Sequence, residues 1–179
     1  AVVAHPGLQL AGVVSTSRSG EDAGTLAGLE PLGLLASPEL PEVDAVAYMA
    51  SGDLRPDEAA ADIAGCLRAG SVVVTPSLYS LYDVQSAPES LAGPLRAAAQ
   101  EGGGALFVSG IDPGWGNDVL PLLVSGLAGT VEQVRCQELF DYSTYDQPEA
   151  VRGSVGMGGS MEDVPLMVAP GVPSMIWGG

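Results

Sequence analysis

The sequence contains no lysine, and six arginines are its only strongly basic residues against 22 aspartates and glutamates. The formal net charge is therefore −16 at pH 7. Proteins that bind nucleic acids need clustered positive charge, because they displace the counterions of the phosphate backbone. Since the six arginines are scattered along the chain, we expect no binding to DNA or RNA.

Cysteine and histidine are equally scarce, with only Cys66, Cys136 and His5 in the whole chain. The two cysteines lie far apart and match neither a zinc site nor a disulfide framework. We therefore expect free thiols, a reducing cytoplasm and no metal. A serine–histidine–aspartate triad is not expected either, because His5 precedes a proline in a turn and is assigned a structural role.

Long apolar runs are missing as well. No run reaches the roughly 18 residues that span a bilayer, and no signal peptide is recognisable, so we predict a cytoplasmic protein without a membrane contact. The chain also lacks an initiating methionine, and its first residues (AVVAHP) read like the end of a helix. We expect it to be a fragment of a longer protein.

Short β-branched runs alternate with alanine-rich segments along the chain. Each run is almost continuously apolar, which is typical of strands buried on both faces of a parallel sheet. The alternation of strands and helices predicts an α/β fold, a Rossmann-type doubly wound parallel sheet that lacks its first strand. The predicted strands cover residues 8–15, 45–50, 71–75 and 105–109, and the predicted helices cover residues 56–69, 91–100 and 117–127.

The residue pattern of the sequence changes after Gly129, where polar residues are interspersed among the apolar ones. We therefore predict a dinucleotide-binding domain over residues 1–129 that lacks its first strand and glycine-rich phosphate loop. Residues 130–179 are predicted to begin an α+β substrate or dimerisation domain, opening with a strand over residues 131–140. We expect the full-length protein to form a homo-oligomer.

In an open α/β sheet the ligand binds beyond the carboxyl ends of the strands. The first predicted strand is followed by Ser15, Thr16, Ser17 and Arg18, with no acidic residue directly behind it. Hydroxyl groups and a guanidinium suit a 2′-phosphate, which favours NADP over NAD, although NAD stays open. The alternative is a polar turn with a solvated arginine.

The second and third predicted strands are followed by small and hydroxyl-bearing residues, among them Ser51, Thr75 and Ser77. Side chains of this size let a dinucleotide pass close to the backbone, so we assign these three residues to cofactor binding. Tyr79 is a candidate proton donor. The alternative for this segment is a surface loop with partly buried rings.

The fourth predicted strand is followed by the sequence GIDPGWGND, residues 110–118. A turn this rich in glycine lets the backbone approach a ligand closely, and its N–H groups can hold a carboxamide. The alternative is a tight strand-to-helix turn capped by Asn117 and Asp118.

This segment and the residues that follow it (VLPLLVSGLAGTVEQVRCQELFDYST) resemble the dihydrodipicolinate-reductase-like superfamily. The nearest branch is the group of 2,4-diaminopentanoate dehydrogenase, the native amine dehydrogenases and their uncharacterised actinobacterial relatives. Members carry a Gly-x-Asn-Pro-Gly turn here, and Asp112 stands where the asparagine is usual.

The resemblance implies that Gly110, Asp112, Pro113 and Gly114 bind the nicotinamide of NADP or NAD. It also implies NAD(P)H-dependent reduction of an imine, or oxidation of an amine, on a small-molecule substrate. Tyr142, at the start of the second domain, is a further catalytic candidate.

One departure is that the amine dehydrogenases carry a glutamate after the strand corresponding to residues 72–75, where this chain reads TPSLYSLY. A non-catalytic dinucleotide-binding or regulatory module therefore stays an alternative. A sugar or cyclitol dehydrogenase of the same architecture is disfavoured, because those enzymes use a lysine–proline pair after this strand.

Overall fold

A computed structural model describes residues 1–52 and 55–172 of the chain. Its contacts divide the chain into two compact units, unit 1 over Ala1–Ala45 and unit 2 over Val46–Gly179. Each unit is described by itself. Asp53, which follows the second predicted strand, lies outside the described residues.

Unit 1 contains two short helices, η1 (Val2–Ala4) and α1 (Ala23–Leu26). The strand predicted over residues 8–15 is wrong, because only Val14 pairs, in an isolated parallel bridge with Ser37. A strand needs a neighbour for each of its N–H and C=O groups, and no described strand runs along this segment.

Asp22 organises the rest of unit 1. Its carboxylate accepts hydrogen bonds from the backbone N–H groups of Thr25 at 3.0 Å, Leu32 at 3.1 Å and Gly33 at 2.7 Å. The bond from Thr25 caps α1 in the way that aspartate favours. These donors, with that of Thr25 first, lower the pKa of Asp22. A single half-buried aspartate thus joins the helix to the segment that follows it.

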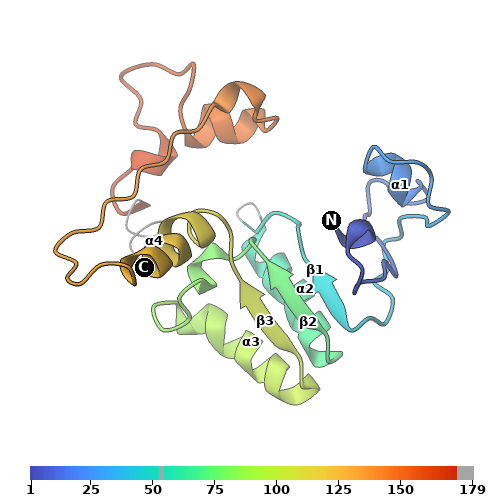
Figure 1. The fold of residues 1–179 in the computed structure, drawn as a ribbon. Coiled ribbons are helices and arrows are strands. Elements are labelled where there is room, and N and C mark those ends of the chain that lie inside the picture. The colour runs from blue at the N-terminus through green and yellow to red at the C-terminus, as the bar shows by residue number, and fades with distance from the viewer. Residues whose placement is uncertain (53–54, 173–179) are drawn as a thin grey trace. The chain divides into compact units, whose positions relative to one another are not determined.

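Unit 2 is built on a parallel sheet of three strands in the order β1 (Ala45–Ala47), β2 (Val72–Thr75) and β3 (Ala105–Val108) (Figure 1). Two helices make the crossovers, α2 (Pro56–Arg68) and α3 (Glu89–Gly102). This confirms the predicted α/β class with a parallel Rossmann-type sheet.

The two crossover helices form where the sequence carries helix signals. Pro56 occupies the first turn of α2, where its missing N–H costs no hydrogen bond. Helix α3 ends at Gly103, whose φ of +76° suits glycine. Both helices pack against each other and the same face of the sheet, and bury Ile63, Leu67 and Leu95 in the core.

Within the described residues of unit 2, the second face of the sheet has no helix packed on it. Along β2, Val73 and Thr75 are fully buried, whereas Val72 and Val74 are 44% and 42% exposed. Phe107 on β3, which pairs with Val74, is 61% exposed. Burial on both faces, as predicted from the continuous apolar runs, is therefore wrong for the described residues, because α2 and α3 both lie on one side.

After β3 the chain forms a π-helical turn, η3 (Trp115–Val119), and then α4 (Leu120–Ser125), which confirms the predicted helix. The strand predicted over residues 131–140 is wrong, since this segment has no partner strand and forms no ladder. The boundary near Gly129 stays a prediction.

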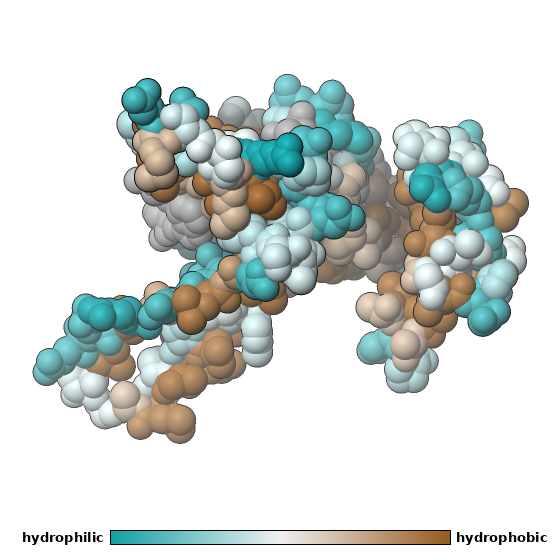
Figure 2. Space-filling model, turned by 90° about the horizontal axis from the view of Figure 1, so that it is seen from above, coloured by the Kyte–Doolittle hydropathy of each residue, from teal (hydrophilic) through white to brown (hydrophobic). Residues whose placement is uncertain are grey.

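The rest of the described chain forms only short turns of helix: η2 (Tyr79–Leu81), η4 (Tyr142–Thr144), η5 (Ala150–Ser154) and η6 (Leu166–Val168). Hydrophobic residues lie at the surface, brown in Figure 2. Within the described residues, none of the helices has the length and apolar character needed to cross a bilayer.

The two faces of β2 give a test of the packing. We expect Val73→Ala to lower the free energy of unfolding by about 2 kcal/mol, because it removes buried methyl groups and leaves a cavity. Val72→Ala, the matched change on the open face, should cost less than about 0.5 kcal/mol. Urea denaturation of the two variants measures both values, and equal losses would show that the open face is covered in the protein.

Candidate functional site

The carboxyl ends of β1, β2 and β3 lie at one edge of the sheet, because the strands are parallel. Three segments follow these ends, over residues 48–52, 76–82 and 109–118. Ser51, Thr75, Ser77 and the Gly110–Gly114 turn all belong to this edge. Ser15, Thr16, Ser17 and Arg18 belong to unit 1.

Thr75 and Ser77 tie the first two of these segments together. The buried Thr75 hydroxyl donates to the carbonyl oxygen of Tyr48 at 2.7 Å and accepts from the N–H of Ser77 at 2.9 Å. The Ser77 hydroxyl donates to the carbonyl oxygen of Ala50. Each hydroxyl proton is thus committed to backbone, so toward a ligand these groups act only as acceptors. Ser51, by contrast, is exposed.

Tyr48, which the sequence reasoning missed, fastens the end of β1 to α2. Its hydroxyl donates to Asp62 at 2.9 Å, and Arg55 donates to the same carboxylate oxygen at 2.9 Å. Burial, followed by the hydrogen bond to Asp62, raises the pKa of Tyr48 to about 12. Tyr48 is therefore protonated at neutral pH and serves the structure of this edge.

The turn after β3 closes on itself. The N–H of Trp115 donates to Gly110 at 2.9 Å, and that of Gly114 donates to the Asp118 carboxylate at 2.8 Å. Gly114 has a φ of +136°, which side chains rarely tolerate. The peptide bond between Asp112 and Pro113 is cis. Since these N–H groups are used inside the turn, the side chain of Asp112 is its main polar feature.

A second carboxyl group, that of Glu138, lies against Asp112. The Glu138 carboxyl interacts with that of Asp112 through a side-chain hydrogen bond and through its charge. Burial first, and then the bond to Asp112 and its charge, raise the pKa of Glu138. Cys136 also contacts this region, since its thiol donates to the carbonyl oxygen of Asn117 at 3.6 Å. Residues 136–138 therefore run along the glycine turn.

Glu138 was not foreseen from the sequence. The segment 131–140 was read as a strand, and such a strand gives no indication of where its polar side chains lie. The only available signal was an acidic residue shortly after the predicted domain boundary.

The tyrosines around this edge differ in their surroundings. Burial, and then the charge of Asp118, raise the pKa of Tyr82. Tyr79 begins η2 and is half-buried. Tyr142 packs edge-on against Phe140, with ring centroids 4.7 Å apart. Catalytic roles for Tyr79 and Tyr142 stay predictions.

In unit 1, Arg18 is engaged by an acidic residue. Its Nε and one terminal nitrogen donate to the two carboxylate oxygens of Glu21, at 2.6 and 2.7 Å. The backbone N–H of Arg18 donates to the Ser15 hydroxyl at 3.2 Å. Thr16 and Ser17 are exposed. Glu21 was missed because an acid was sought only directly behind the strand.

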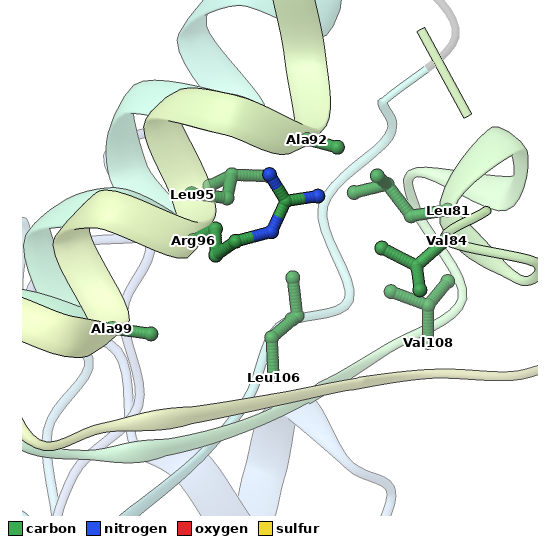
Figure 3. A pocket seen from close by; sticks show the side chains of 8 residues that line it. All are labelled: Leu81, Val84, Ala92, Leu95, Arg96, Ala99, Leu106 and Val108. Carbon is green, nitrogen blue, oxygen red and sulfur yellow. The ribbon is translucent and has the colours of Figure 1, made fainter. Parts of the chain in front are cut away.

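One cavity of about 260 Å³ lies apart from these carboxyl groups, between α3, β3 and the turn at Leu81 (Figure 3). Its lining is apolar except for Arg96, which is ion-paired with Glu89 at 3.1 Å. No three histidine, cysteine, aspartate or glutamate side chains gather into a metal site within the described residues.

Comparison with known proteins gives one informative relative. No family model matches the chain. A curated protein named amine dehydrogenase, from Streptomyces virginiae, is 54% identical over 187 aligned residues, which cover 100% of this chain and 52% of that protein. The chain thus spans about half the length of this relative. The predicted resemblance to amine dehydrogenases is confirmed along the whole chain.

Proposed function

We propose that this chain carries the cofactor-side half of a nicotinamide-dependent oxidoreductase that acts on carbon–nitrogen bonds, by amine oxidation or imine reduction. The observation that carries this proposal is the pairing of Asp112 with Glu138 beside the glycine turn at the carboxyl edge of the sheet. The relative named amine dehydrogenase supports the reaction class. A small-molecule amine or carbonyl compound is the corresponding substrate.

The residues at this edge fit a dinucleotide. Gly110 has no side chain to block an approach to the backbone, and the exposed Ser51 offers a hydroxyl. A Cβ at Gly52 would meet the carbonyl oxygen of Ser77 at 2.7 Å, so the two loops are already in close contact. In unit 2 we assign NAD(P) to Ser51, Ser77 and the Gly110–Gly114 turn. In unit 1, taken by itself, Ser15–Arg18 are the candidates for contact with the adenosine ribose. When NAD(P) is bound, its nicotinamide supplies the hydride acceptor or donor.

Asp112 and Glu138 would handle the substrate nitrogen. The negative charge that the pair carries above the raised pKa of Glu138 attracts an ammonium or iminium group. A cationic amine bound between the two carboxylates gains both of them as hydrogen-bond acceptors. The pair also provides an acceptor for the proton that amine oxidation releases. Glu138 thereby takes the place of the glutamate that the segment after β2 lacks.

A non-catalytic dinucleotide-binding module is the second candidate. It is favoured by the absence of a glutamate from the segment after β2, which reads TPSLYSLY. Both candidates bind the cofactor, but only the oxidoreductase converts a substrate.

The direct test uses the purified protein at the full length of its reading frame. We expect the fluorescence of NADH or NADPH to change on binding, and reduced nicotinamide to accumulate at 340 nm when the oxidised cofactor is mixed with primary amines. Binding without turnover on a panel of amines would favour the module. No binding of either cofactor would contradict the proposal.

Substituting Glu138 separates substrate binding from cofactor binding. We expect Glu138→Gln to raise KM for the amine roughly tenfold, since it removes a charge-assisted hydrogen bond, while leaving the Kd of the cofactor unchanged. Glu132→Gln, an exposed residue of the same segment, removes the same charge elsewhere and should leave KM unchanged. An equal effect of the two substitutions would show that Glu138 acts only through net charge.

The raised pKa of Glu138 also predicts a pH dependence. The folded protein holds this proton more tightly than the unfolded chain, so the carboxyl stabilises the fold at low pH and loses that contribution as pH rises through its raised pKa. Amine binding follows the opposite course, because the charge appears as pH rises. We expect kcat/KM for the amine to fall on acidification through this pKa, and Glu138→Gln to abolish that limb of the profile. An unchanged limb in the variant would assign it to another group.

A further inference from the structure

We propose that Glu21 is a specificity-determining residue, which withholds Arg18 from a 2′-phosphate and makes the protein prefer NAD(H) over NADP(H). This inference rests on the proposed function, because it assigns the Ser15–Arg18 turn to the adenosine ribose of the cofactor. It reverses the preference for NADP that Arg18 alone leads us to expect.

Arg18 and Glu21 form a bidentate ion pair. Glu21 occupies Nε at 2.6 Å and one terminal nitrogen at 2.7 Å. These two donors form one edge of the planar guanidinium, an edge that also binds phosphate in a bidentate manner. A 2′-phosphate at this edge must therefore displace the carboxylate.

The backbone holds both side chains in place. The N–H of Arg18 donates to the Ser15 hydroxyl at 3.2 Å, and the N–H of Glu21 donates to the carbonyl oxygen of Arg18 at 3.2 Å. Gly20 donates to the carbonyl oxygen of Ala36 at 2.8 Å, and Ala36 donates back to that of Glu21 at 2.8 Å. The pair thus projects from a hydrogen-bonded turn.

Acidic residues outnumber basic ones in unit 1. Arg18 is the only arginine or lysine in the sequence of residues 1–45. The same stretch contains six acidic residues, namely Glu21, Asp22, Glu30, Glu39, Glu42 and Asp44. A phosphate monoester carries between about one and a half and two negative charges at neutral pH. Unit 1 therefore offers a 2′-phosphate no second arginine or lysine once Arg18 is paired.

The 2′-hydroxyl of NAD, unlike a 2′-phosphate, is uncharged and can donate a hydrogen bond to a carboxylate. A carboxylate oxygen has lone pairs to spare after one hydrogen bond, so Glu21 can accept from the 2′-hydroxyl of NAD while still holding Arg18. Both side chains are largely exposed, at 58% for Arg18 and 45% for Glu21. A ligand can therefore reach the pair without a rearrangement of the core.

The experiment compares Glu21→Gln with Glu30→Gln in the protein at the full length of its reading frame. We expect wild type to bind NADH more tightly than NADPH. Glu21→Gln should raise the affinity for NADPH relative to NADH roughly tenfold, because the guanidinium becomes free for a charge-assisted hydrogen bond. Glu30→Gln removes the same charge from unit 1 and should leave the ratio unchanged. Adding Arg18→Ala to Glu21→Gln should abolish the gain.

The outcomes separate this inference from the proposed function. Titration of nicotinamide fluorescence gives both dissociation constants for each variant, and circular dichroism checks that the variants fold. A wild-type preference for NADPH, or a ratio that Glu21→Gln leaves unchanged, would overturn the role of Glu21 while leaving cofactor binding intact. Failure of wild type to bind either cofactor would overturn the proposed function and this inference with it.

Discussion

The parallel pairing of β2 with β3, from Val72 opposite Ala105 to Thr75 opposite Val108, determines where the polar segments that follow these two strands emerge. Strands that run in the same direction need a crossover between them, and here each crossover is a helix on the same face. The carboxyl ends then meet at one edge, with Thr75 as the buried link to Tyr48. The glycine turn lies at this edge because β3 ends there.

The parts of this arrangement that depend on local signals could be predicted from the sequence. Helices α2 and α3 begin and end near residues whose backbone preferences are strong, such as Pro56 and Gly103. The turn at Gly114 was recognisable because its composition is unusual. The strand predictions for residues 8–15 and 131–140 were wrong for a different reason. An apolar, β-branched run shows that a segment tolerates a sheet, whereas a ladder also needs a neighbouring strand.

The candidate site could likewise be predicted only where local sequence signals are enough. Glu21 and Glu138 were both missed, although each is visible as an acidic residue in the sequence. Their roles depend on what lies beside them, which is Arg18 in one case and Asp112 in the other. The Glu21 contact spans three residues and follows a hydrogen-bonded turn. The Glu138 contact joins residues far apart in sequence, and no periodic pattern encodes it.

The two glutamates also show how a chain with a net charge of −16 can give its carboxylates distinct chemistry. Glu21 is neutralised by a guanidinium, which stays charged at every relevant pH, so this pair responds to competing anions and to salt. Burial and the neighbouring Asp112 raise the pKa of Glu138, so the charge of that pair depends on pH. A phosphate-bearing ligand tests the first pair, and an amine tests the second. Under the proposed function, selection of the cofactor and selection of the substrate would depend on different counter-charges, and each can be tested separately.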